Sequence, residues 1–240
     1  ELGFGFEVIS YRMGELRMER IDAIFKARGV QGVIIAPIDQ PGTDFDFPWD
    51  QYAVGALGGS VLTPLISYVM MHFQHGMARA LTEVKSRGYR RVGFFHSERS
   101  GSRSEYLQLM SFLLHNHATE PSNRLEPLSV DGMPASEIAD WMRVNQPDVI
   151  ISSWYQGWEC MQKLRINIPE DVGFVSLSTR DRHPQVSGMT VPIVAMADAA
   201  VDLVVAQVLR NERGLPKTPK CVLVEGVWNE GATLRQVASC

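Results

Sequence analysis

The stretch "INIPEDVGFVSLS" (166–178) joins a helical pattern to an apolar run. Pro169 disfavours helical backbone at the residue before it, so the sequence predicts that the preceding helix ends there. Glu170 and Asp171 then keep the connection in solvent. The run that follows, 172–177, is apolar without alternating polar residues, which is typical of a strand covered on both faces. The stretch therefore predicts the helix-to-strand connection of an α/β protein with a parallel sheet.

The same change from helical to strand pattern recurs along the chain. Helices with one apolar face lie between the apolar runs, which predicts βαβ units. A long segment near the end, 196–212, is apolar on nearly all sides and is expected to form a buried helix. The remaining expected strands are "GFEVIS" (5–10), "GVIIAPI" (32–38), "YAVGAL" (52–57), "RVGFF" (91–95) and "DVIISS" (148–153).

Composition limits the function classes. The net charge of -4 over 240 residues gives no basic surface for nucleic acid within this sequence. No run approaches the roughly 18 apolar residues that span a bilayer. The cysteines Cys160, Cys221 and Cys240 are too scattered for a disulfide framework or a zinc site, and they favour a reducing cytoplasm. Since the sequence begins at Glu1 without Met, we expect further sequence upstream.

Motifs of catalysis and of cofactor binding are missing from the sequence. No G-x-G-x-x-G, Walker A or G-x-S-x-G motif follows an expected strand, and no Ser, His and acid set stands in a recognisable context. His72 and His75 share a helical face, but a metal site needs more ligands than the sequence places near them. The sequence therefore predicts neither an enzyme nor a cofactor or metal site.

Polar and aromatic residues follow three successive strands. They lie in "HSERSGSRSEY" (96–106), in "SSWYQGWE" (152–159) and at Ser178 and Thr179. The first segment is expected to enter a helix near residue 102 or 103. Ligands of open parallel sheets gather beyond the carboxyl ends of the strands. Hydroxyls, an arginine fork and a stacking Trp154 or Tyr155 suit a sugar. A solvated helix cap explains the first segment equally well, and core packing explains Trp158 better.

With these segments in order, the chain resembles the effector-binding domain of the LacI/GalR transcription regulators. The resemblance implies a type I periplasmic-binding-protein fold, α/β, with two Rossmann-like subdomains, parallel sheets and three crossovers. It places 1–90 with about 193–220 in the first subdomain, and 91–192 with about 221–240 in the second. The matching stretches are "ARGVQGVIIAP" (27–37), "SRGYRRVGFF" (86–95), "RSEYLQLM" (103–110), "PDVIISS" (147–153), "NIPEDVGFVSLS" (167–178) and "MTVPIVAMADAAVDLVVAQVL" (189–209).

The family's ligand residues carry over unevenly. Arg103 matches an arginine that opens a helix and binds effector hydroxyls, although Tyr106 replaces the usual glycine. Other acids of the family pattern are lost at this chain's matching positions. The residues that the resemblance places in the ligand site are Arg103, Trp154, Ser178, Thr179, His72, Phe73, Ser153 and Tyr155.

The resemblance also implies a function. The chain would sense a sugar or similar small polar metabolite, form a homodimer and control DNA binding by a helix-turn-helix domain upstream. The family's first strand and first helix are expected upstream too, because that strand lies in the middle of the first sheet. A periplasmic or secreted sugar-binding protein of a transporter has the same fold and stays open as the alternative. An upstream helix-turn-helix or a signal peptide discriminates the two.

Overall fold

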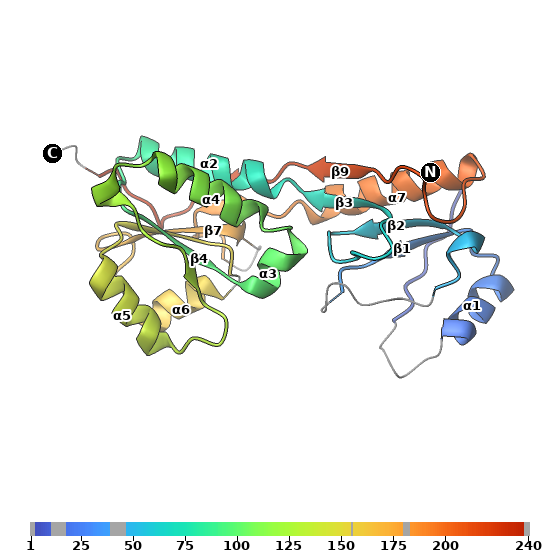
Figure 1. The fold of residues 1–240 in the computed structure, drawn as a ribbon, viewed down its shortest axis with the longest axis horizontal. Helices are drawn as coiled ribbons and strands as arrows, with labels where there is room; N and C mark the ends of the chain where they lie inside the picture. Colours follow the sequence, from blue (N-terminus) through green and yellow to red (C-terminus); the bar gives the residue numbers. More distant parts are fainter. Residues whose placement is uncertain (1–2, 11–17, 39–46, 155, 180–182, 238–240) are drawn as a thin grey trace.

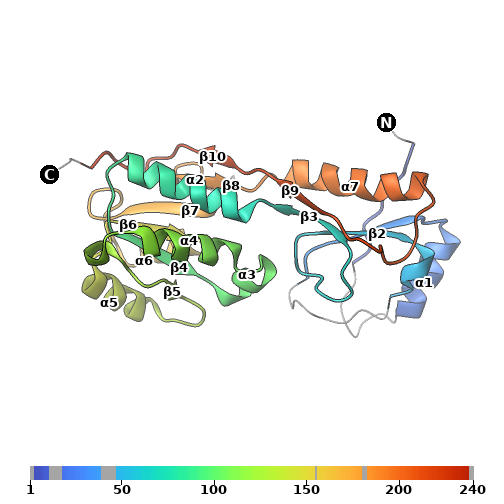
Figure 2. The ribbon, with the colours of Figure 1, turned by 45° about the horizontal axis from the view of Figure 1, so that its top comes forward.

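The apolar runs form the strands of two separate sheets in the computed structural model (Figure 1), which describes residues 3–10, 18–38, 47–154, 156–179 and 183–237. Each sheet has its own hydrophobic core, so the chain forms two subdomains side by side (Figures 1 and 2). The α/β class, the parallel sheets and the type I periplasmic-binding-protein architecture are thereby confirmed. No described helix has the length and apolar character needed to cross a membrane.

The first subdomain is a four-stranded parallel sheet in the order β1-β2-β3-β9. One face of β2 packs with α1 residues Ile21 and Phe25. The other face carries Gly55, which lets Val204 of α7 approach the sheet closely. The elements are α1 (Met18–Ala27), β1 (Gly32–Ile35), a 3-10 turn (Trp49–Gln51), β2 (Ala53–Leu57), β3 (Ser67–Met71), α7 (Ile193–Leu209) and β9 (Cys221–Val224).

The second subdomain is a six-stranded sheet in the order β10-β8-β7-β6-β4-β5, antiparallel only between β10 and β8. Phe94 of β4 packs under α2 and α4, and the next residue, Phe95, packs on the opposite face. Its elements are α2 (Phe73–Ser86), β4 (Val92–His96), α3 (Glu98–Arg103), α4 (Leu107–Ala118), a 3-10 turn (Pro121–Asn123), β5 (Leu128–Ser129), α5 (Ala135–Asn145), β6 (Val149–Ser152), α6 (Gly157–Lys163), β7 (Gly173–Thr179), β8 (Gly188–Thr190) and β10 (Val227–Asn229).

The chain passes between the subdomains three times, at 72, 191–192 and 225–226. These positions differ from the expected boundaries. The helix α2 lies before residue 90 but packs with β4, β6 and β7, because its apolar face fits the second core. Residues of β9 lie after 220 but pair with β3 of the first sheet. The subdomain boundaries are corrected accordingly.

Three local expectations are also corrected. Residues 5–10 form no strand, and Phe6 is exposed, because no described strand lies beside them to pair with. The apolar helix is Ile193–Leu209 and is buried only along one face, so Val194 remains exposed. The helix before "IPEDV" ends at Lys163, several residues before Pro169.

The "IPEDV" connection is nevertheless a closed turn that leads into β7. The Asp171 N–H donates to the Asn167 carbonyl at 2.8 Å. The Arg235 guanidinium donates to the Pro169 carbonyl at 3.1 Å and to the Glu170 carbonyl at 2.9 Å. A side chain from the far end of the chain therefore holds the turn that the sequence identified.

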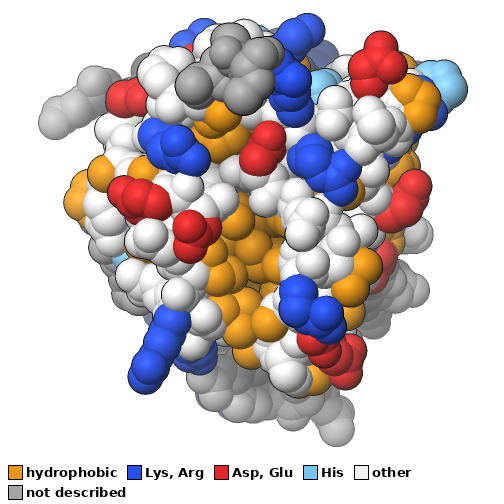
Figure 3. Space-filling model, turned by 90° about the vertical axis from the view of Figure 1, so that its left-hand side faces the viewer, with side chains coloured by type: hydrophobic (Ala, Val, Ile, Leu, Met, Phe, Trp, Pro, Cys, Tyr) orange, Lys and Arg blue, Asp and Glu red, His pale blue; other side chains and the backbone are white. Residues whose placement is uncertain are grey.

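The end of the second subdomain farthest from the first carries a hollow with hydrophobic side chains, surrounded by charged ones (Figure 3). This end lies opposite the carboxyl ends of β4 and β6, which point toward the first subdomain (Figure 1).

A substitution at Gly188 tests the pairing of β7 with β8. Its φ is +153°, and a Cβ there would lie 1.9 Å from the Ser176 carbonyl oxygen. We expect Gly188→Ala to lower the free energy of unfolding by at least about 2 kcal/mol, because the backbone has to move. Gly5→Ala is the control, since its Cβ would meet nothing within 4 Å. Denaturant unfolding measures both, and an unchanged midpoint for Gly188→Ala would contradict the pairing.

Candidate functional site

Three adjacent strands of the second sheet end at one edge. β6 pairs in parallel with both β4 and β7, so their carboxyl ends lie next to one another. The Ser153 N–H donates to the Phe95 carbonyl at 3.0 Å and ties the end of β6 to that of β4. The side chains that the sequence placed after successive strands therefore gather at a single edge.

Trp154 is held by the turn that follows β6. The Ser152 hydroxyl donates to the Trp154 carbonyl oxygen at 3.1 Å and accepts from the Trp154 N–H at 3.2 Å, so it bonds both backbone groups of Trp154. Gly157 is required where α6 begins, because a Cβ there would lie 2.4 Å from Ser152 Oγ. The half-buried Trp154 ring packs against the second core. Tyr155, predicted beside it, lies outside the described residues.

Ser178 and Thr179 both lie within β7 and not beyond it, because the strand continues to Thr179. The Thr179 side chain is buried, and its hydroxyl lies 3.2 Å from the Thr190 hydroxyl of β8. Ser178 is half-buried, and no group in the described ranges pairs with its hydroxyl. Ser178 is therefore the freer donor of the two for a ligand.

Arg103 ends a helix and does not open one. The structure begins α3 at Glu98, closes it at Arg103 and starts α4 at Leu107. The linker between them holds Glu105 and Tyr106 in the left-handed region, at φ 52° and 55°. The Tyr106 ring lies over Gly101, where a Cβ would approach it to 2.8 Å. The guanidinium of Arg103 has no ion-pair or hydrogen-bond partner within the described part of the chain.

This linker is also where the two subdomains touch. A Cβ on Gly59, which follows β2, would lie 2.7 Å from the Arg103 carbonyl oxygen. The Tyr68 hydroxyl of β3 donates to Glu105 Oε1 at 3.3 Å. Burial, more than any other cause, raises the pKa of the Tyr68 phenol. Arg103 thus sits at the contact between the subdomains.

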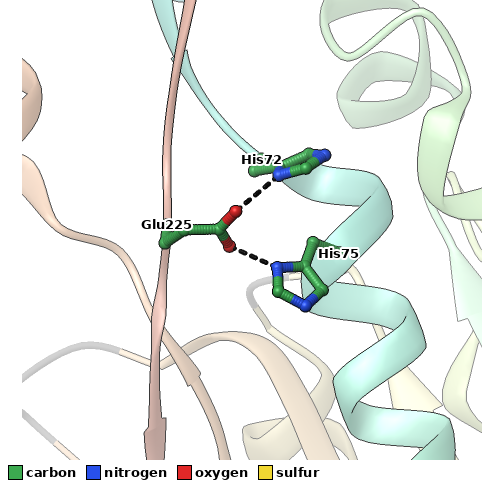
Figure 4. A group of neighbouring side chains, drawn as sticks. All are labelled: His72, His75 and Glu225. Atoms are coloured by element: carbon green, nitrogen blue, oxygen red, sulfur yellow. Dashed lines mark hydrogen bonds and ion pairs between the residues drawn. The ribbon is translucent and has the colours of Figure 1, made fainter.

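His72 and Phe73 lie at a different place, the crossing from β3 to α2. Phe73 packs against the core of the second subdomain. His72 Nδ1 lies 2.6 Å from Glu225 Oε1, and His75 Nδ1 lies 2.6 Å from Glu225 Oε2 (Figure 4). Glu225 was missed by the sequence analysis because it lies 153 residues from His72. The structure therefore places His72 beside Glu225 at the crossings, and Phe73 in the core of the second subdomain.

Comparisons with known proteins agree with this architecture. No protein-family model and no curated protein matches the chain. Solved structures do match over most of its length. A LacI-family transcriptional regulator of Enterococcus faecium with bound ribose is 13% identical, with a TM-score of 0.66 over 92% of this chain and 85% of that one. A putative LacI-family regulator of Rhizobium etli is 16% identical, with a TM-score of 0.69 over 93% and 85%. The chain has the LacI-regulator fold.

A third match has the same fold and a different bound sugar. The periplasmic binding protein/LacI transcriptional regulator of Alkaliphilus metalliredigens, complexed with D-xylulofuranose, is 15% identical. Its TM-score is 0.65, and the match covers 90% of this chain and 82% of that chain. At these identities the LacI-regulator fold is what the matches share.

His96 is a further polar residue at the strand-end edge of the second sheet. It ends β4, is buried and stacks on Phe94 at a ring separation of 5.9 Å. Within the described ranges its Nδ1 has no hydrogen-bond partner. Burial lowers the pKa of His96, against an opposing effect of Glu98 and Asp131. Its position after an expected strand was the only signal in the sequence, and this did not distinguish it from its neighbours.

The buried imidazole makes stability depend on pH. The pKa of His96 is lower in the folded chain than in the unfolded one, where it is about 6.5. Its contribution is therefore complete above that value and is lost as pH falls toward the folded pKa. We expect His96→Gln to make the loss of unfolding free energy between pH 7 and 5 shallower, by up to about 1.4 kcal/mol per pH unit. His117→Gln, an exposed change on α4, is the control in urea titrations, and equal slopes would contradict the prediction.

Proposed function

We propose that the chain is the effector-binding domain of a LacI-type transcription regulator that senses a sugar or similar small polar metabolite. One observation carries this proposal: the partly buried Arg103, whose backbone meets Gly59 of the first subdomain, has a guanidinium that is unpaired within the described chain. An Arg fork binds vicinal hydroxyls or a carboxylate at two points. Ribose and D-xylulofuranose are bound in two regulators of the same fold.

Arg103, Trp154 and Ser178 are proposed to contact the effector between the subdomains, with Ser153, Thr179, Tyr155, His72 and Phe73 as the further candidates. Trp154 presents an aromatic surface that suits the apolar face of a sugar ring. The Ser178 and Ser153 hydroxyls sit at neighbouring strand ends and supply donors and acceptors. Thr179 and Phe73 are the weaker candidates, because one hydroxyl is engaged and the other side chain packs in the core.

Regulation follows from the two contacts between subdomains. At the first contact, the three crossings join the subdomains. At the second, Gly59 and Tyr68 of the first subdomain meet the α3–α4 linker of the second subdomain. An effector that binds one inter-subdomain angle more tightly shifts the population toward it, by no more than its difference in affinity. We propose that a homodimer passes this shift to an upstream helix-turn-helix domain in the cytoplasm.

A binding protein of a transporter remains the second candidate. The Alkaliphilus metalliredigens protein is described as both periplasmic binding protein and LacI regulator, which shows that the fold serves both descriptions. The sequence upstream of Glu1 decides between them, since a helix-turn-helix supports regulation and a signal peptide supports transport.

Arg103→Ala tests the ligand site. We expect the affinity for a sugar found by calorimetric screening to fall at least about tenfold, because a charge-assisted hydrogen bond contributes about 1.5–3 kcal/mol. Arg143→Ala is the matched control, since that arginine is exposed on α5. Retention of full affinity in Arg103→Ala would remove this residue from the site. A chain that binds no sugar or related metabolite would contradict the proposed function itself.

Dimerisation is proposed on the apolar face that α4 leaves uncovered. Met110, Leu113 and Leu114 are exposed there, one helical turn apart. Exposed apolar clusters of this kind mark association surfaces. The opposite side of α4 packs in the core through Phe112, which leaves this apolar side exposed.

Leu114→Glu tests this face. A charge placed in a self-complementary apolar contact is repeated in both copies, so we expect the dimer to dissociate at least about tenfold more readily. Val144→Glu is the control, because Val144 on α5 is 70% exposed and Leu114 is 72% exposed. Sedimentation velocity over a concentration series measures the dissociation constant. Equal effects of both changes, or a monomeric wild type, would contradict the assignment.

A further inference from the structure

Two imidazoles and one carboxylate meet at the crossings between the subdomains. His72 precedes α2 and His75 lies in its first turn, so both rings project from the same side of the helix (Figure 4). The ring centroids are 5.4 Å apart. Glu225 lies between β9 and β10 and places one carboxylate oxygen 2.6 Å from each Nδ1. Three side chains from two crossings thus converge on one point.

Their dimensions fit a metal ion. Zinc binds imidazole nitrogen and carboxylate oxygen at about 2.0–2.2 Å, so tetrahedral ligand atoms lie about 3.3 Å apart. The ligand atoms of His72, His75 and Glu225 all lie within 4.8 Å of one another. Small rotations of the side chains therefore bring all three to bonding distance, without a change in the backbone.

The backbone around the three ligands is already fixed. The His72 N–H donates to the Val224 carbonyl at 2.9 Å, directly before Glu225. β3 and β9 are paired up to Met71 and Val224. Because both ligand-bearing segments are held together before any ion binds, the ion has little chain entropy to overcome.

Solvent access and charge also suit a cation. The side chains of His72, His75 and Glu225 are 29%, 59% and 56% exposed, so a hydrated ion can reach all three. Two imidazoles and one carboxylate select transition metals such as zinc over magnesium or calcium, which prefer oxygen ligands.

We propose that His72, His75 and Glu225 form a site for one divalent transition-metal ion, with zinc as the best-fitting ion. Water completes the coordination, because three protein ligands leave a tetrahedral position open. The ion links the β3–α2 crossing to the β9–β10 crossing. It therefore resists relative movement of the subdomains at the edge that joins them.

Zinc titration of the untagged chain, in competition with a chromophoric chelator, tests the site. We expect one ion per chain, and at least about tenfold weaker binding in His75→Ala and in Glu225→Gln, because each loses one of three ligands. His117→Ala and Cys221→Ser are the controls, since both change exposed potential ligands elsewhere. Absence of stoichiometric binding at 100 μM zinc, a concentration of about 10⁻⁴ M that saturates any micromolar site, would overturn the site. So would undiminished binding in both ligand variants.

Hydrogen exchange tests separately whether bound zinc restrains the two crossings. The His72 amide bonds to Val224 across the two crossings. We expect zinc to slow its exchange in the wild type and in His117→Ala, and to leave it unchanged in Glu225→Gln. A wild-type chain that binds zinc with no slower exchange at His72 would overturn the link between the crossings. Because Arg103, Trp154 and Ser178 supply none of the three ligands, loss of effector binding in Arg103→Ala leaves this test unaffected.

Discussion

The pairing of β3 with β9 is the constraint on which the two-subdomain arrangement depends. It runs in register from Tyr68 opposite Cys221 to Met71 opposite Val224, and both strands then leave for the second subdomain. Gly226, in the third crossing, lies close to the first two, since a Cβ there would approach Met71 Cε to 2.6 Å and Met189 Cε to 3.1 Å. All three crossings are therefore packed together, and the subdomains can turn about this point more easily than they can slide.

The second contact between subdomains is of a different kind. At the α3–α4 linker, Glu105 and Tyr106 hold left-handed backbone that costs roughly 1 kcal/mol or more per non-glycine residue. Neighbouring contacts must compensate: Tyr106 lies over Gly101, and Glu105 accepts a hydrogen bond from Tyr68 of the first subdomain. If the subdomains separate at this linker, the hydrogen bond from Tyr68 to Glu105 is lost, and with it one of these compensating contacts. The ligand proposed at Arg103 would therefore act on this contact, while the β3–β9 pairing holds the crossings.

The sequence predicted the strands that are buried on both faces. β4, β6 and β7 agree with the predicted strands to within a residue or two, because continuous apolar runs bounded by helices have one simple interpretation. Residues 5–10 have an equally strand-like pattern but form none, because a strand depends on a neighbour and not on its own residues. β3 was not predicted, since Pro64 and Leu65 before it gave no clear boundary. For α7, composition suggested burial on all sides. Only one face, which includes Val204, is buried against the sheet, and the outer face is exposed.

The candidate site likewise contains residues whose positions follow from strand order and residues whose positions depend on distant parts of the chain. Neighbouring strands of one parallel sheet bring their carboxyl ends together by topology alone, so Ser153 and Trp154 follow β6 beside the end of β4, as the order of the strands predicted. Ser178 was expected after β7 and lies within it, because that strand is longer. The helix that ends at Arg103 was not placed correctly, because left-handed residues after it divide one predicted helix into two. Glu225 had no local signal at all. His72 and His75 are visible together as one helical face, but their third partner depends on β9 returning beside β3. The pairing that fixes the hinge is thus also what assembles the His72, His75 and Glu225 cluster, and any ligand bound there acts on the hinge directly.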